Sequence, residues 1–267
     1  MLRTEMRNPA TTHIDQMDLP EMLKIINAEN RRAVEAVETA LPSIAQAIDA
    51  IVASFSCGGR LIYVGAGTSG RMAVADAAEC PPTFGISADQ ITAIMAGGPA
   101  CMAHAAEAEE DNAQMGRKNL LEASPTARDV LVGISASGGA AYVLGAMEQA
   151  KALGCTVISL TSNPGSLMEQ ASDIAICTDT GPEVITGSTR MKAGTAQKLV
   201  LNMLSTCSMV RMGMVYENMM VNIKPSNDKL RNRMLNIVME LTGWDEAQAK
   251  AQLEQQDWNI RRTVDAG

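Results

Sequence analysis

The chain has 267 residues, of which 46% are hydrophobic and 19% charged, a balance typical of a soluble protein with one large domain and a small appendage. Its net charge of −8 argues against a nucleic-acid-binding surface, which requires a basic stripe. The 6 cysteines contain no C-x-x-C pair, and no apolar run reaches membrane-span length, so a zinc site, a disulfide framework and a membrane protein are not expected. The start of the chain lacks a signal-peptide profile, and we expect a cytoplasmic protein.

The N-terminal part, residues 1–55, is expected to be helical after a polar, irregular start. Asp18 can cap a helix whose first turn accommodates Pro20. Apolar residues then follow a helical rhythm, and we expect Pro42 to break this helix. A second helix would run from there to about Phe55, before C-G-G.

The central part, residues 56–215, alternates short apolar runs with helical patterns. This alternation is typical of a parallel sheet with helices on both faces. The expected strands are 60–66, 90–98, 129–135, 155–162 and 172–178. The expected helices between and after them are 69–79, 99–123, 138–154, a short helix before the last strand, and about 190–212. Residues 216–267 are expected to form a separate unit of three helices.

The loop after the first strand contains G-x-G-x-x-G at Gly65, Gly67 and Gly70. A dinucleotide site would also need a carboxylate at the end of the next strand, to bind the ribose. That strand instead ends in Ala96-Gly97. A glycine-rich turn at a helix start is better suited here to a single phosphate.

Hydroxyl side chains gather in three loops that follow strands of the same sheet. Ligands of such sheets bind at the carboxyl ends of the strands, so these loops should share one rim. Serine and threonine also cap helices for purely structural reasons, and this alternative remains. The residues are Thr68, Ser69, Ser135, Ser137, Thr186, Ser188 and Thr189.

The runs "GAGTS", "SASG" and "GPEVITGSTRMKAGTAQ" resemble the sugar-phosphate-binding loops of sugar isomerase (SIS) domains. Together with "GAGTSGRMAVADAAECPPTFG", "EAEEDNAQMG" and "MMVNIKPSNDKL", they resemble the bacterial N-acetylmuramic acid 6-phosphate etherase family over nearly the whole chain. This resemblance implies an α/β fold of the SIS type, a doubly wound five-stranded parallel sheet with flanking helices. It also implies that the C-terminal helices form a small unit similar to a ubiquitin-associated domain.

The resemblance implies cleavage of the D-lactyl ether to give N-acetylglucosamine 6-phosphate and D-lactate, in the breakdown and recycling of peptidoglycan sugars. No metal or redox cofactor is needed for elimination followed by water addition. The family's proton donor falls on Glu79, and its second catalytic glutamate on Glu110, which would act as the base or in water addition. Which glutamate removes the carbon-bound proton stays open. The implied substrate-binding residues are Gly67, Thr68, Ser69, Ser135, Ser137, Ser188 and Thr189.

The chain departs from the SIS pattern at Ala140, where relatives commonly carry a hydroxyl. Arg190 and Lys192 follow the third loop and could pair with phosphate, with the lactyl carboxylate or with acidic neighbours. The long helix at 190–212, rich in Met and Leu, favours a homodimer. Two alternatives are a non-catalytic sugar-phosphate sensor, as in animal glucokinase regulatory protein, and a sugar-phosphate isomerase. A sensor would not need the glutamate pair.

Overall fold

A parallel sheet forms the centre of the protein, and the computed structural model describes residues 2–104 and 107–266. The strands run in the order β2-β1-β3-β4-β5, and every pairing between neighbours is parallel. The sheet predicted from the alternating pattern is therefore confirmed. Its strands are β1 (Leu61–Gly65), β2 (Ile91–Met95), β3 (Val130–Ile134), β4 (Thr156–Thr161) and β5 (Ile174–Cys177).

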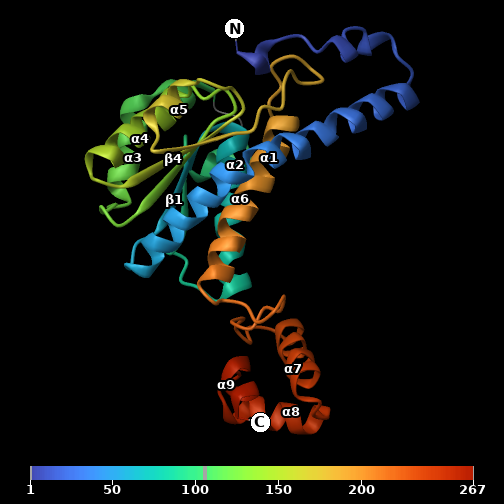
Figure 1. The fold of residues 1–267 in the computed structure, drawn as a ribbon, viewed down its shortest axis with the longest axis vertical. Coiled ribbons are helices and arrows are strands. Elements are labelled where there is room, and N and C mark those ends of the chain that lie inside the picture. Colours follow the sequence, from blue (N-terminus) through green and yellow to red (C-terminus); the bar gives the residue numbers. More distant parts are fainter. Residues whose placement is uncertain (1, 105–106, 267) are drawn as a thin grey trace.

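Helices cover both faces of this sheet (Figure 1). One face is packed against α1, α2 and α6, and the other against α3, α4 and α5. The helices of the first face are α1 (Leu19–Ser56), α2 (Gly67–Phe84) and α6 (Lys192–Arg211). Those of the second are α3 (Ala113–Glu122), α4 (Ala141–Ala152) and α5 (Leu167–Ala171).

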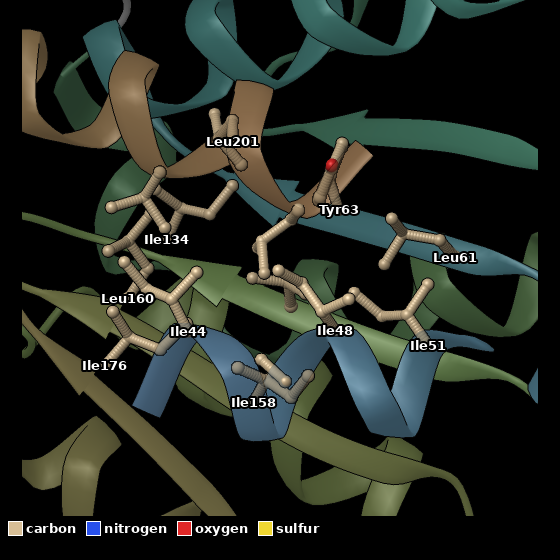
Figure 2. Close-up of a cluster of buried hydrophobic side chains, with 14 of the residues drawn as sticks. Ile44, Ile48, Ile51, Leu61, Tyr63, Ile134, Ile158, Leu160, Ile176 and Leu201 are labelled. Carbon is tan, nitrogen blue, oxygen red and sulfur yellow. The ribbon is translucent and has the colours of Figure 1, made fainter. Parts of the chain in front are cut away.

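Side chains along each strand alternate between two hydrophobic clusters, as the pleat requires. In β1, Leu61 and Tyr63 face the α1–α2–α6 side, whereas Ile62 and Val64 face the other side. Figure 2 shows the first cluster, in which isoleucines of α1 lie over β3, β4 and β5. Both faces are covered, so the ends of the strands are left for a ligand.

Helix α1 is continuous through Pro42, and the expected break there is wrong. Pro42 has no backbone N–H to donate a hydrogen bond to the carbonyl of Glu38, and the loss of this bond normally weakens a helix. The same apolar stripe, however, is buried before and after it, from Ala33 to Ile51, and this packing keeps the helix intact. By length and composition α1 could also span a membrane, although core helices of soluble proteins meet the same criteria.

Helix α2 also passes through prolines and does not end at Cys-Pro-Pro as expected. It continues past Pro81 and Pro82 to a left-handed cap at Gly85, because Cys80 and Phe84 bury the inner side of its last turns. The expected helix at 99–123 is likewise broken up. The described parts of this stretch are 3₁₀ turns at Pro99–Met102 and Glu107–Asp111, followed by α3.

The C-terminal helices α7 (Asp228–Thr242), α8 (Glu246–Gln255) and α9 (Ile260–Asp265) enclose a hydrophobic cluster of their own. They lie beyond the end of α6, away from the sheet (Figure 1). Asn227 caps α7 and Gly243 ends it, as the sequence predicts. The boundary expected near residue 216 and the likeness to a ubiquitin-associated domain both stay predictions.

Candidate functional site

A cavity of about 480 Å³ opens at the carboxyl edge of the sheet, between the loops that follow β1 and β3. These strands are neighbours where the strand order reverses, the usual ligand position in open α/β sheets. The cavity brings together the substrate-binding residues expected from the sequence: Gly67, Thr68, Ser69, Ser135, Ser137, Ser188 and Thr189. Thr186 instead lines a smaller cavity beside residues 7–14.

The loop after β1 places the start of α2 against the cavity. Gly65 fits tightly, because a Cβ there would lie 2.7 Å from the amide nitrogen of Gly70. Ala66 caps α2 without a side-chain hydrogen bond, so no cap side chain covers the first amides, which can attract an anion. Ser69 Oγ lies 2.9 Å from Gln197 Oε1, to which it donates a hydrogen bond that joins α2 to α6.

The loop after β3 forms a compact turn around two serines. Ser135 Oγ and Ser137 Oγ lie 3.2 Å apart. They also accept hydrogen bonds from the amides of Gly138 and Gly139, at 3.3 and 3.2 Å respectively. Ala140, where the SIS resemblance predicts a hydroxyl, is the N-cap of α4 and lines the cavity without capping the helix by its side chain. The site therefore keeps two hydroxyls here and lacks the third.

A carboxylate holds the third loop at the start of α6. Glu183 is fully buried and accepts hydrogen bonds from the amides of Lys192 and Ala193, at 3.0 and 2.9 Å. Burial raises the pKa of Glu183, although these amides and the Lys192 charge oppose the rise. The loop that carries Ser188 and Thr189 is thus fixed at both of its ends.

A buried ion pair lies beneath this loop. Lys192 is completely buried and its Nζ pairs with Glu29 of α1, which also accepts a 2.7 Å hydrogen bond from Asn8. Burial opposes ionisation of Glu29, but the hydrogen bonds from Lys192 and Asn8 lower its pKa below the ordinary value. Of the roles open to Lys192 from the sequence, the structure supports pairing with an acidic neighbour.

The N-terminal segment contributes to the site, which the sequence did not indicate. Thr4 is buried and exchanges hydrogen bonds with Asn163, and Thr11 donates to the carbonyl of Val184 at 2.8 Å. These contacts bring Glu5 to the cavity wall. A polar run without periodicity gives no signal for such docking, because its partners lie more than 150 residues away.

Glu110 lies in the cavity, opposite the start of α2. A Cβ built on Gly67 would be 2.7 Å from Glu110 Oε1, so the carboxylate lies directly against this backbone. The φ angle of Gly67 is +53°, a conformation that favours glycine. Glycine at this position therefore serves both the turn and the close approach of the carboxylate.

Glu79, the expected proton donor, lies outside this cavity. It is an exposed residue of α2, 12 positions after Gly67 and therefore about 18 Å along the helix axis. The three hydroxyl loops and Glu110 come together within one chain, and Glu79 does not join them there.

Two arginines line the cavity, Arg71 from the first turns of α2 and Arg190 from the third loop. His104 is exposed, and its carbonyl accepts a hydrogen bond from Arg71. Among the described residues, histidine, cysteine and acidic side chains form no group of three that could hold a metal ion.

Two family models match the chain. Residues 43–151 match the glucokinase regulatory protein N-terminal SIS domain, and residues 105–207 match the SIS domain. Together these ranges contain the sheet and the three hydroxyl loops.

Curated relatives are similar over nearly the full chain. A protein of Aeromonas hydrophila named N-acetylmuramic acid 6-phosphate etherase is 52% identical, over 98% of this chain and 88% of its own length. Proteins with the same name from Actinobacillus pleuropneumoniae and Serratia proteamaculans are 50% and 48% identical, over 98% of this chain and 86% and 89% of theirs.

Solved structures share the fold at lower identity. Phosphoheptose isomerase from Neisseria gonorrhoeae has a TM-score of 0.54 and 23% identity, over 72% of this chain and 98% of its own. A phosphoheptose isomerase from Francisella tularensis has a TM-score of 0.53 and 21% identity, over 73% of this chain and 99% of its own. At these identities the likeness concerns the SIS-type fold alone.

Proposed function

This chain belongs to the N-acetylmuramic acid 6-phosphate etherase family, and we propose that it cleaves the lactyl ether of its substrate by elimination followed by water addition. It is an enzyme of the carbon–oxygen lyase class. The products are N-acetylglucosamine 6-phosphate and D-lactate. The observation that carries the proposal is the cavity in which the hydroxyl loops and the carboxylate of Glu110 meet.

The reaction begins once the sugar ring opens. A base removes the hydrogen from the carbon beside the aldehyde, the neighbouring carbon–oxygen bond breaks, and the lactate oxygen gains a proton. Water then adds to the resulting double bond. The hydroxyl loops and the first amides of α2 hold the phosphate, which fixes the reacting carbons in the cavity. Glu110 lies in the same cavity, within reach of a bound sugar.

A second copy of the chain supplies the other glutamate in this proposal. Glu79 is exposed and far along α2 from its own cavity, so it can enter the cavity of a partner. The outer side of α1 offers an apolar surface for such a contact: Leu19, Leu23, Val34 and Leu41 are 64%, 59%, 59% and 45% exposed. A homodimer that covers this surface completes two identical sites.

The setting that fits this activity is the cytoplasm, in the recycling of cell-wall amino sugars. All 6 cysteines are free thiols, which suits a reducing compartment.

Cleavage in ¹⁸O-labelled water tests the elimination mechanism. The proposal predicts D-lactate without label and a sugar product with label in its new hydroxyl group. Label in the lactate hydroxyl would show that water attacks the lactyl carbon instead. Retention of the lactyl group with isomerisation of the sugar would favour the isomerase, and binding without any product would favour the sensor.

A heterodimer with different tags on its chains tests the shared site. One chain carries Glu79→Gln and the other Glu110→Gln. If each site uses glutamates from both chains, one intact site remains, and the purified heterodimer has about half of the wild-type turnover. Both homodimeric variants serve as inactive controls. A heterodimer as inactive as these controls would contradict the shared site.

A further inference from the structure

The proposed substrate carries two anionic groups, the 6-phosphate and the lactyl carboxylate, and this inference rests on that proposed function. Among the described residues that line the cavity, Arg71 and Arg190 carry positive charge. The acidic side chains Glu5 and Glu110 lie in the same lining. A second anion that enters beside these carboxylates needs a cation of its own, because like charges at short range oppose binding.

The two arginines reach the cavity from different elements. Arg190 directly follows Ser188 and Thr189 of the third loop. Arg71 lies one helical turn after Gly67, on the same side of α2. Arg71 also donates hydrogen bonds to the segment that precedes Glu110 in the chain, so it is the arginine on the side of that carboxylate and, in this proposal, of the reacting carbons. The lactyl group is attached to one of those carbons.

Hydrogen bonds hold the Arg71 side chain in place. Its Nε donates to the carbonyl of Met102 at 3.1 Å, and its Nη2 donates to the carbonyl of His104 at 3.0 Å. These bonds use two of the five N–H donors of a guanidinium. The remaining donors of such a fixed, planar fork match the two oxygens of a carboxylate.

We propose that Arg71 binds the lactyl carboxylate and so distinguishes the ether substrate from its lactate-free product. Arg190 and the hydroxyl loops hold the phosphate that substrate and product share. Arg71 is then a specificity-determining residue, and the charge that it recognises departs with the leaving group. Release of D-lactate removes this contact and leaves the sugar held by its phosphate end.

Binding of three ligands to Arg71→Gln tests the assignment. Substrate binding is measured by calorimetry in the slow Glu110→Gln background, so that the substrate is not consumed. We expect affinity for N-acetylmuramic acid 6-phosphate to fall about 10- to 100-fold, the usual effect of a lost charge-assisted hydrogen bond. Affinity for N-acetylglucosamine 6-phosphate should stay within about 2-fold of its value with Arg71. The uncharged lactyl amide of the substrate should bind both proteins equally.

Arg190→Gln is the matched control, since it removes a charge from the same cavity. It should weaken binding of both sugar phosphates by similar factors. Arg71→Lys keeps the charge without the fork, and its affinity for the substrate should fall between that of the protein with Arg71 and that of the Arg71→Gln variant.

Two results would overturn the proposal. Equal weakening of substrate and product by Arg71→Gln would place Arg71 at the phosphate. Unchanged preference for the acid over the amide, together with a lower melting temperature, would limit Arg71 to fixing the segment at Met102 and His104. The ratio of acid to amide affinity separates the proposal from both of these results, because loss of a phosphate contact and loss of a purely structural role each change the two affinities alike.

Discussion

The two ends of helix α2 differ in almost every respect. The first turns, from Gly67 to Arg71, line the cavity and lie against the carboxylate of Glu110. The last turns carry the exposed Glu79 and continue through two prolines toward the C-terminal unit, whose Asn222 carbonyl would lie 1.9 Å from a Cβ on Gly85. One end is shaped for a ligand, and the other for contact with protein.

This difference shows that neighbours in a sequence motif need not share a site within one chain. "GAGTSGRMAVADAAECPPTFG" spans both ends of α2, yet a rigid helix keeps Gly67 and Glu79 about 18 Å apart. In the proposed homodimer, a second chain brings Glu79 to the cavity that the start of this motif lines.

The largest expected effect comes from the carboxylate at the cavity end. Glu110→Gln should lower D-lactate release by about 10²- to 10⁴-fold, because an acid–base group is lost, while binding of N-acetylglucosamine 6-phosphate persists. Glu109→Gln is the matched control, since Glu109 lines a different cavity. Equal losses in both variants would mean that the acidic run acts only through its overall charge.

Moving the Glu110 carboxylate without removing it should have the next largest effect on turnover. In Gly67→Ala the new methyl group would lie 2.7 Å from Glu110 Oε1, so kcat should fall about 100-fold as the carboxylate moves. The left-handed backbone adds a stability cost of about 1–2 kcal/mol.

Gly213→Ala controls for that backbone cost, because Gly213 has φ +73° and no atom within 4 Å of its Cβ position. Its melting temperature should fall while kcat is unchanged. A normal kcat in Gly67→Ala would show that the position of Glu110 is not critical.

A smaller effect should come from the middle of α2, where hydrogen bonds of Asp76 join this helix to α6. Asp76 is buried and accepts hydrogen bonds from Tyr63, Asn202 and Ser205 at 3.1, 2.6 and 3.1 Å. Asp76→Asn should cost about 1–3 kcal/mol of unfolding free energy in denaturant titrations, because an amide cannot accept all of these bonds.

The exposed Asp49, which pairs with Arg211 on the surface, provides the control for Asp76. Asp49→Asn should change the unfolding free energy by less than about 1 kcal/mol. Equal effects of the two substitutions would contradict a fixed contact between α2 and α6.

The smallest effect concerns the opposite edge of the sheet, where Asp129 pairs with Arg60 at 2.8 Å. Burial opposes ionisation of Asp129, but the hydrogen bond from Arg60 lowers its pKa below 3.8. Such a carboxyl stabilises the fold above pH 3.8 and loses that contribution as the pH falls through its folded pKa. Unfolding free energy measured against pH should show this acid loss in the wild type, and Asp129→Asn should flatten it.

Much of the sheet and its rim could be predicted from local patterns. Short apolar runs bounded by glycine and polar residues fix the strands, and parallel pairing then brings their carboxyl ends together. Ser135 and Ser188 could therefore be placed at one edge without coordinates. The loops that bear them reach the same cavity.

What could not be predicted depends on contacts between distant residues. Pro42 and Pro81 are locally typical of helix ends, and burial on both sides of each overrides that tendency. Lys192 and Glu29 form an ion pair although they are 163 residues apart in the sequence, and no local pattern predicts it. The extension of α2 past Glu79 could not be predicted either, because it depends on the burial of Cys80 and Phe84 against other elements.

Cys80, next to the exposed Glu79 on α2, should have an unreactive thiol. Its thiol is buried beside Asp76, and burial raises its pKa to about 12. The reactive form of cysteine is the thiolate, so this neighbour of Glu79 should resist alkylating agents and oxidants at neutral pH. Cys57 and Cys207, both exposed, would react first. Thiol-directed dyes can therefore mark this protein at its surface without modifying the residue next to Glu79.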